Sequence, residues 1–134
     1  MAGLTGRPGK AGTSSKPASQ ASASADSDAL ARGLELIRAG EFFAAHEELE
    51  DAWRAAEPTE RDFLQGLVHV AVAWYQAGRG NRVGCERQLE KAQRRLGPYA
   101  PRHGGVDIAA LLERLRAAAE TVEAGSLELG QPFL

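Results

Sequence analysis

The chain has 134 residues, which is enough for one domain of ordinary size. Its apolar fraction of 43% is typical of a globular protein, and 16 basic against 18 acidic residues give a formal net charge of -2. The first 25 residues hold three of the bases and no acid, so the remainder carries all 18 acids against 13 bases. A mildly acidic domain is not expected to bind the phosphate backbone of nucleic acid.

The cysteine content and the hydropathy of the chain bear on its compartment. The single cysteine, Cys85, excludes an intrachain disulfide and fits a reducing cytosol. No stretch approaches the roughly 18 consecutive apolar residues of a membrane span. The N-terminal segment has basic residues but lacks the apolar stretch of a secretory signal. We therefore expect a cytoplasmic protein without a membrane partner.

Composition divides the chain into three parts. Residues 1–25 are rich in Ala, Ser, Gly and Pro, and their single large aliphatic side chain is Leu4. Such a segment cannot bury enough apolar surface to offset its chain entropy. The sequence therefore predicts a disordered tail at 1–25, a helical domain at 26–125 and a short C-terminal tail at 126–134.

Apolar residues at helical spacing predict five helices within the domain. Thr59, Asn81 and Asp107 are candidate N-caps for the third, fourth and fifth of them. The third is apolar on every side and is therefore expected to be the central helix of the fold. No segment shows the alternation of a strand. The helices are expected at about residues 28–39, 41–56, 60–77, 81–96 and 108–124.

An internal repeat at an offset of 40 residues indicates how the helices are connected. Each copy has the order helix, glycine turn, helix, proline, which is the pattern of a helical hairpin and distantly resembles tetratricopeptide repeats. Two copies are fewer than a solenoid needs. We expect an all-α, compact bundle of about five helices, made of two helical hairpins and a C-terminal helix. The matching pairs are Gly40 and Gly80, Leu49 and Leu89, Ala52 and Ala92, and Pro58 and Pro98.

Polar residues are expected to meet between the second and third helices. A short turn joins these helices, so they should pack as an antiparallel hairpin. With the turn centred near residue 57 or 58, His46 would face His69 and Glu50 would face Gln65. Within each helix the two residues are four positions apart, which places them on one face. The candidate polar site consists of His46, Glu47, Glu50, Arg61, Gln65 and His69.

Three kinds of chemistry fit these residues. Two imidazoles and a carboxylate can bind zinc or iron. His46 with Glu47 or Glu50 can transfer protons or bind a small ligand. A hydrogen-bonded network that fixes the register of the hairpin is favoured, because buried polar groups most often satisfy one another. The zincin motif is excluded, because Glu50 stands where that motif needs a second histidine.

Two separated motifs resemble a known family. The run from Gly40 to Trp53, GEFFAAHEELEDAW, and the run from Arg61 to Val68, RDFLQGLV, followed by Gly80-Asn81, are similar to the signature of the bacterial and archaeal family known as domain of unknown function 309. The resemblance implies a small, cytoplasmic, all-helical protein and no established activity. The family commonly has Gln at the position of His69, which counts against a shared two-histidine metal site. The matching positions are His46, Glu47, Glu50, Trp53, Arg61, Gln65, Gly66 and Asn81.

The leading functional hypothesis is a binding or interaction module that uses the polar site between the second and third helices. The alternatives are an acid–base enzyme, for instance a hydrolase, that uses His46 with Glu47 or Glu50, and a purely structural role for the cluster. The sequence identifies no cofactor and no metal site, and the partner is an unidentified protein or small molecule. A homodimer is an open alternative, because the fifth helix has an apolar face at Ile108, Leu111 and Leu115.

Overall fold

The computed structural model describes the backbone of residues 18–132 and the side chains of residues 28–132. Five α-helices dominate it, and the predicted all-α class is confirmed. The helices are α1 (Ala18–Arg38), α2 (Phe42–Ala55), α3 (Pro58–Gly78), α4 (Arg82–Leu96) and α5 (Ile108–Glu123). A short 3-10 turn, η2 (Gly97–Tyr99), and two strands, β1 (Arg102–His103) and β2 (Val106–Asp107), connect α4 to α5.

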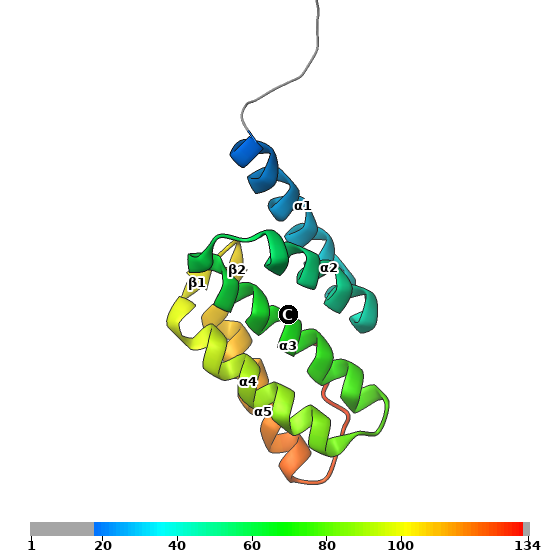
Figure 1. Cartoon of the computed structure of the whole chain (residues 1–134). Coiled ribbons are helices and arrows are strands. Elements are labelled where there is room, and N and C mark those ends of the chain that lie inside the picture. Colours follow the sequence, from blue (N-terminus) through cyan, green and yellow to red (C-terminus); the bar gives the residue numbers. More distant parts are fainter. Residues whose placement is uncertain (1–17, 133–134) are drawn as a thin grey trace, which may run out of the picture.

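Consecutive helices are neighbours in space, as the predicted hairpins require (Figure 1). The helices α2, α3 and α4 form one antiparallel layer, with α3 in the middle. Helix α1 packs along α2, and α5 packs along α4 on the far side of that layer in Figure 1. The chain after α5 then runs back behind α3. No helix in the described part of the chain is long and apolar enough to cross a membrane.

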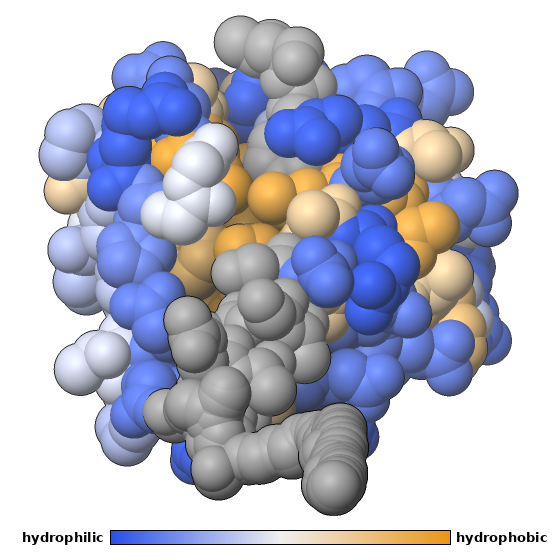
Figure 2. Space-filling model, turned by 90° about the horizontal axis from the view of Figure 1, so that it is seen from above, coloured by the Kyte–Doolittle hydropathy of each residue, from blue (hydrophilic) through white to orange (hydrophobic). Residues whose placement is uncertain are grey.

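Helix α3 is the central helix, as its apolar pattern predicts. Ten of its residues are buried, among them Phe63, which is 1% exposed. Gly66 allows α4 to approach closely, because a Cβ at this position would lie 2.6 Å from Cγ of Leu96. None of the described residues that are fully buried is polar or charged. Hydrophilic side chains cover much of the face seen from above, and apolar groups lie near its centre (Figure 2).

The two helical hairpins have matching turns, which supports the repeat seen in the sequence. Gly40 and Gly80 have φ angles of 81° and 77°, in the left-handed region that favours glycine. In each turn this glycine and the next residue donate their N–H groups to carbonyls of the preceding helix, which is the Schellman arrangement. The bonds are Gly40 to Ile37 and Glu41 to Leu36 in the first turn, and Gly80 to Ala77 and Asn81 to Gln76 in the second.

The start of the fold differs from the sequence prediction in two respects. Helix α1 begins at Ala18, ten residues before the expected start, and so includes residues 18–25 of the predicted tail. The rest of that prediction concerns residues 1–17, which lie outside the described residues. Thr59 does not cap α3, because the helix begins at Pro58 and Glu57 is its N-cap residue. Proline is favoured at this first helical position because its missing N–H would have no helical partner there.

The connection between α4 and α5 contains a strand pair that the sequence analysis did not predict. His103 pairs with Val106 and Arg102 with Asp107, around a turn in which Gly104 and Gly105 both have positive φ. The imidazole of His103 lies against the ring of Phe63, with 4.7 Å between the ring centres, and its Nε2 lies 2.8 Å from Oε1 of Glu60. The hairpin is thereby attached to the first two turns of α3.

The segment after α5 packs against the bundle. Nε1 of Trp74 donates a hydrogen bond of 2.7 Å to the carbonyl of Gly130, and Arg114 on α5 donates to the carbonyl of Gln131. Pro132 is fully buried. The described part of the expected C-terminal tail, residues 126–132, is thus attached to both α3 and α5.

Candidate functional site

His46 and Glu50 lie together on α2, as their spacing predicts. They are four positions apart, so they are neighbours on one face of the helix. Nε2 of His46 lies 3.4 Å from Oε2 of Glu50, and their side chains are 24% and 37% exposed. The other carboxylate oxygen of Glu50 lies 3.5 Å from the guanidinium of Arg54. Glu50 therefore lies between a histidine and an arginine at the edge of the bundle.

A hollow of about 210 Å³ lies beside His46, between α2 and α3. Phe43 forms part of its wall and is 52% exposed, which is unusual for a large aromatic side chain. The centre of its ring lies 5.5 Å from that of His46 and 5.4 Å from that of Tyr75. We call this hollow the Phe43 hollow; its lining residues are Phe43, His46, Val72, Tyr75 and Gln76.

The second ring nitrogen of His46 has no partner. Nδ1 is buried and makes no hydrogen bond with any described group. If Nε2 carries the proton and donates it to Glu50, Nδ1 is a free acceptor. A buried polar atom without a partner costs free energy, and in native proteins such atoms often mark a functional position.

His69 does not join His46. Its Nδ1 lies 2.7 Å from Oε1 of Gln88, which belongs to α4. Burial lowers the pKa of His69 below its ordinary value of 6.5, although the hydrogen bond with Gln88 opposes this shift; the positive charges of Arg95, Lys91 and Arg94 lower the pKa further. His69 is therefore neutral at pH 7, and its chemistry belongs to the α3–α4 interface.

The predicted register between α2 and α3 is shifted. His46 shares the Phe43 hollow with Val72, three positions beyond His69. Phe43 likewise contacts Tyr75. Near the turn, Nε of Arg61 on the first turn of α3 donates a hydrogen bond to the carbonyl of Ala56, the residue that follows α2. Facing positions therefore come later along α3 than a symmetrical turn would place them.

The remaining predicted site residues are dispersed. Glu47 is exposed on α2, and Gln65 is half-buried on α3. Arg61 is exposed, and its Nε donates a hydrogen bond to the backbone carbonyl of Ala56. Of the six predicted residues, His46 and Glu50 are the two that a direct contact joins. Among the described residues, no group of three or more His, Cys, Asp or Glu side chains is placed to hold a metal ion.

The sequence analysis missed Phe43 as a site residue. A signal was present, because Phe42 and Phe43 are adjacent on a helix with one buried face, so both rings cannot point into the core. Phe42 packs against the core, and Phe43 points outward. The one cysteine, by contrast, behaves as a packed small residue: Cys85 is fully buried, and burial raises the pKa of its thiol to about 11, which keeps it protonated and unreactive.

Comparison with known proteins identifies a family that matches part of the chain. Residues 30–88 match the family described as Domain of unknown function (DUF309). These residues belong to the DUF309 family. The matched segment extends from the middle of α1 to the middle of α4, and it therefore contains the Phe43 hollow and both sequence motifs. The resemblance inferred from those motifs is confirmed, and the family description names no activity.

A curated relative of the chain is the Uncharacterized protein YpuF of Bacillus subtilis (strain 168). The two are 32% identical over 93 residues, which cover 67% of this chain and 53% of the relative. The chain thus spans about half the length of the curated relative that it matches. The relative's name also states no activity, so a function must be argued from the geometry.

Proposed function

We propose that this protein is a binding module that uses the Phe43 hollow to recognise a segment of a partner protein. The observation that carries this proposal is the exposed ring of Phe43, which is held against His46 and Tyr75 beside a hollow of about 210 Å³. Exposed aromatic side chains next to a pocket are typical anchors of protein interfaces. A ring that is already held in place loses little conformational freedom when it binds.

The lining of the hollow indicates what the partner segment should contain. Phe43, Val72 and the ring of Tyr75 offer apolar contact, which suits an aliphatic or aromatic side chain. Glu47 lies one helical turn from Phe43, and both are exposed. A partner segment with an apolar residue next to a Lys or Arg would match this arrangement.

The test is a comparison of variants in partner capture. Purified full-length protein, Phe43→Ala and Glu120→Ala would be immobilised and exposed to extract of the source cells. Glu120 is exposed on α5 and serves as the matched control. We expect a partner that the wild type and Glu120→Ala both retain and Phe43→Ala loses, while circular dichroism shows all three folded. Identical recovery by all three proteins would reject the Phe43 hollow as the binding site.

A second candidate function is acid–base catalysis by His46 with Glu50, which is favoured by their 3.4 Å contact beside an open hollow. Glu47 is the weaker carboxylate for this role, because no hydrogen bond or ion pair within the described residues joins it to His46. A panel of ester, amide and phosphate-ester substrates provides the test. Turnover by the wild type that disappears in His46→Gln and Glu50→Gln would support it, and equal rates in the variants would exclude it.

We further propose that the protein acts in the cytoplasm. The support is the single cysteine, which is free and buried, so that the fold uses no disulfide within the described residues.

The homodimer considered from the sequence loses its basis, because Ile108, Leu111 and Leu115 are 0%, 2% and 0% exposed and belong to the core of the single chain.

A further inference from the structure

Two large apolar side chains are exposed in the part of the chain that the structure describes, and they occupy equivalent places in the two hairpins. Phe43 is 52% exposed and Val83 is 58% exposed. They are 40 residues apart, which is the offset of the internal repeat, and each lies in the first turn of its helix, α2 or α4. Single exposed apolar side chains are ordinary on a protein surface, so the neighbouring residues decide whether these two mark an interface.

The charges beside these two residues are opposite in sign. Helix α2 has an acid one helical turn after Phe43 and another acid two turns after it, whereas α4 has a base at each equivalent place. Residues four positions apart lie on one face of a helix, so each apolar side chain shares a face with its two charges. The equivalent pairs are Phe43 and Val83, Glu47 and Arg87, and Asp51 and Lys91.

Most of these charges are not neutralised within the described part of the chain. The side chains of Glu47, Arg87 and Lys91 make no ion pair or hydrogen bond with any described residue. Asp51 differs, because it pairs with Arg54 on its own helix. Arg87 and Lys91 are thus left to attract an acidic partner, and Glu47 is left to attract a basic one. The other bases of α4 are each paired with a carboxylate: Arg82 with Glu86, Arg94 with Glu90, and Arg95 with Asp62.

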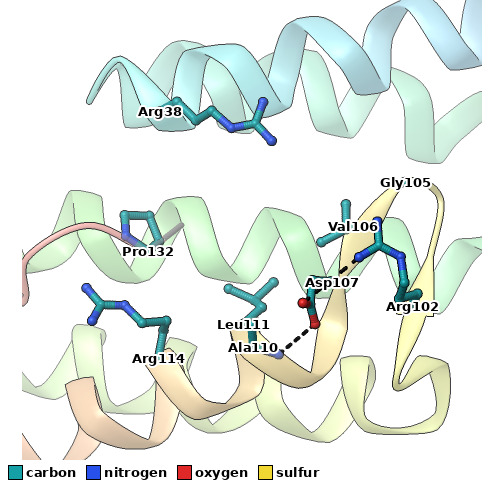
Figure 3. Close-up of a pocket in the computed structure, with 9 residues that line it drawn as sticks. All are labelled: Arg38, Arg102, Gly105, Val106, Asp107, Ala110, Leu111, Arg114 and Pro132. Atoms are coloured by element: carbon teal, nitrogen blue, oxygen red, sulfur yellow. Dashed lines mark hydrogen bonds and ion pairs between the residues drawn. The ribbon is translucent and has the colours of Figure 1, made fainter. Parts of the chain in front are cut away.

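The fold places the two charge patterns on either side of α3. Because α2, α3 and α4 form an antiparallel layer with α3 in the middle, α2 and α4 run in the same direction (Figure 1). Helix α1 packs along α2, and α5 packs along α4. A pocket of about 240 Å³ lies between α1 and α5, and Arg38 lies across it from Arg102 and Arg114 (Figure 3). The exposed residues of α2 and α4 therefore lie on surfaces that α1 and α5 do not cover.

Two copies of this layer, placed face to face, match each other in charge in one orientation. A two-fold axis parallel to α3 places α2 of each copy opposite α4 of the other, so that acids oppose bases in both contacts. A two-fold axis across α3 would place α2 opposite α2, and acids would then oppose acids. The charges thus favour the first pairing and disfavour the second.

We propose that the protein forms a two-fold homodimer in which the Phe43 hollow of each copy receives the partner's Val83. This inference rests on the proposed function and names the partner as a second copy of this chain. The hollow suits an apolar residue next to a Lys or Arg, and Val83 follows Arg82 directly and precedes Arg87 by one turn. The pairing does not use α5, whose apolar face belongs to the core.

The first experiment is sedimentation velocity of the full-length protein at low ionic strength, from about 1 μM to about 1 mM. We expect a reversible equilibrium between monomer and dimer. Val83→Ser should weaken the dimer about tenfold or more, because the lost apolar contact occurs twice. Arg116→Glu, at an exposed arginine of α5, is the control and should leave the dimer unchanged. A wild type that stays monomeric, or that forms ever longer oligomers as its concentration rises, would overturn the proposal.

Charge reversal tests the pairing of α2 with α4. Glu47→Arg and Arg87→Glu should each weaken the dimer about tenfold or more, because each places like charges in both contacts. A mixture of the two variants should dimerise again, since in the mixed pair position 47 of each copy opposes the opposite charge at position 87 of the other. Full dimerisation of either single variant, or a mixture that stays monomeric, would overturn the proposed interface.

The homodimer and the proposed function fail under different results. If the wild type is monomeric while Phe43→Ala loses a partner from cell extract, the hollow binds another protein, so the proposed function stands and the homodimer is rejected. If Phe43→Ala dimerises as well as the wild type and also recovers the same proteins from extract, both are rejected. Loss of the dimer in Phe43→Ala, with the fold retained by circular dichroism, is the result expected of the homodimer.

Discussion

Tyr75 on α3 lies with its ring centre 5.4 Å from that of Phe43 on α2, although Phe43 is 52% exposed. The contact links two helices at a position where the ring of Phe43 has little else to cover it. His46 contacts the same ring from its own helix, so Phe43 is held from two sides. An exposed side chain that is both apolar and held in place is better suited to recognition than to building the core.

The effect of Phe43 on stability should therefore be small. Phe43→Ala removes two ring contacts and should lower the free energy of unfolding by about 1 kcal/mol. Phe63→Ala, at a position that is 1% exposed, should lower it by about 3–5 kcal/mol. Urea unfolding followed by circular dichroism measures both. If Phe43→Ala lowered the free energy of unfolding as much as Phe63→Ala does, Phe43 would be a core residue that stabilises the fold.

His69 should make the protein less stable in mild acid. Its pKa is lowered in the folded state, mainly by burial, so below its ordinary value of 6.5 the unfolded chain binds the proton more readily. The free energy of unfolding then decreases as the pH falls from about 6.5 through the folded-state pKa. His69→Gln, which can still bond to Gln88, should remove this contribution. Urea unfolding at about pH 7.5 and about pH 5.5 measures it; an unchanged pH dependence in the variant would contradict it.

Any side chain at position 66 should lower the stability of the fold. A Cβ there would lie 2.6 Å from Cγ and 2.7 Å from Cδ2 of Leu96, both in the core, so Gly66→Ala should cost about 1–3 kcal/mol of stability. Gly78 is a matched control at the end of the same helix, where a Cβ would have no neighbour within 4 Å. Gly78→Ala should be neutral or should stabilise by up to about 1 kcal/mol. Thermal unfolding compares them, and equal melting temperatures would refute the close packing of α3 on α4.

Asn81 should stabilise the α3–α4 turn by capping. Its side chain accepts a hydrogen bond of 2.9 Å from the N–H of Gly84 and donates one of 3.0 Å to Gln76. Asn81→Ala should lower the free energy of unfolding by about 1 kcal/mol. Glu41, at the equivalent place in the α1–α2 turn, makes no side-chain cap bond, so Glu41→Ala should change little. A similar effect of both substitutions in urea unfolding would argue against capping as the cause.

Features governed by local rules were predictable from the sequence. The apolar period placed α2 to α5 within a few residues, and the predicted caps Asn81 and Asp107 both accept a bond from their helix. The start of α1 was missed because its first ten residues, although rich in alanine, lack an apolar stripe. The strand pair was missed because each strand has two residues, which is too short for an alternating pattern.

The site was predictable in part. Contacts within one helix follow from the spacing of residues, whereas contacts between helices depend on how the helices pack. The His46–Glu50 contact depends on spacing within one helix, so the sequence could give it. The pairing of His46 with His69 depends on how two helices slide past each other. Side-chain packing sets that offset, and a shift of three residues moves His69 away from His46 and leaves it bonded to α4. The pocket between α1 and α5 is built from elements distant in sequence, and no local pattern marks it.

The segment that follows α5 lines one of the two pockets and not the other. It contributes Pro132 to a pocket between α1 and α5 and accepts the bonds of Arg114, yet it lies outside the residues that match the family, as do β1, β2 and α5. The Phe43 hollow lies wholly inside the matched residues. The two pockets share no lining residue, so a substitution in the lining of one leaves the lining residues of the other unchanged. A chain that differs only after α4 would keep every lining residue of the Phe43 hollow and change most of the lining of the second pocket.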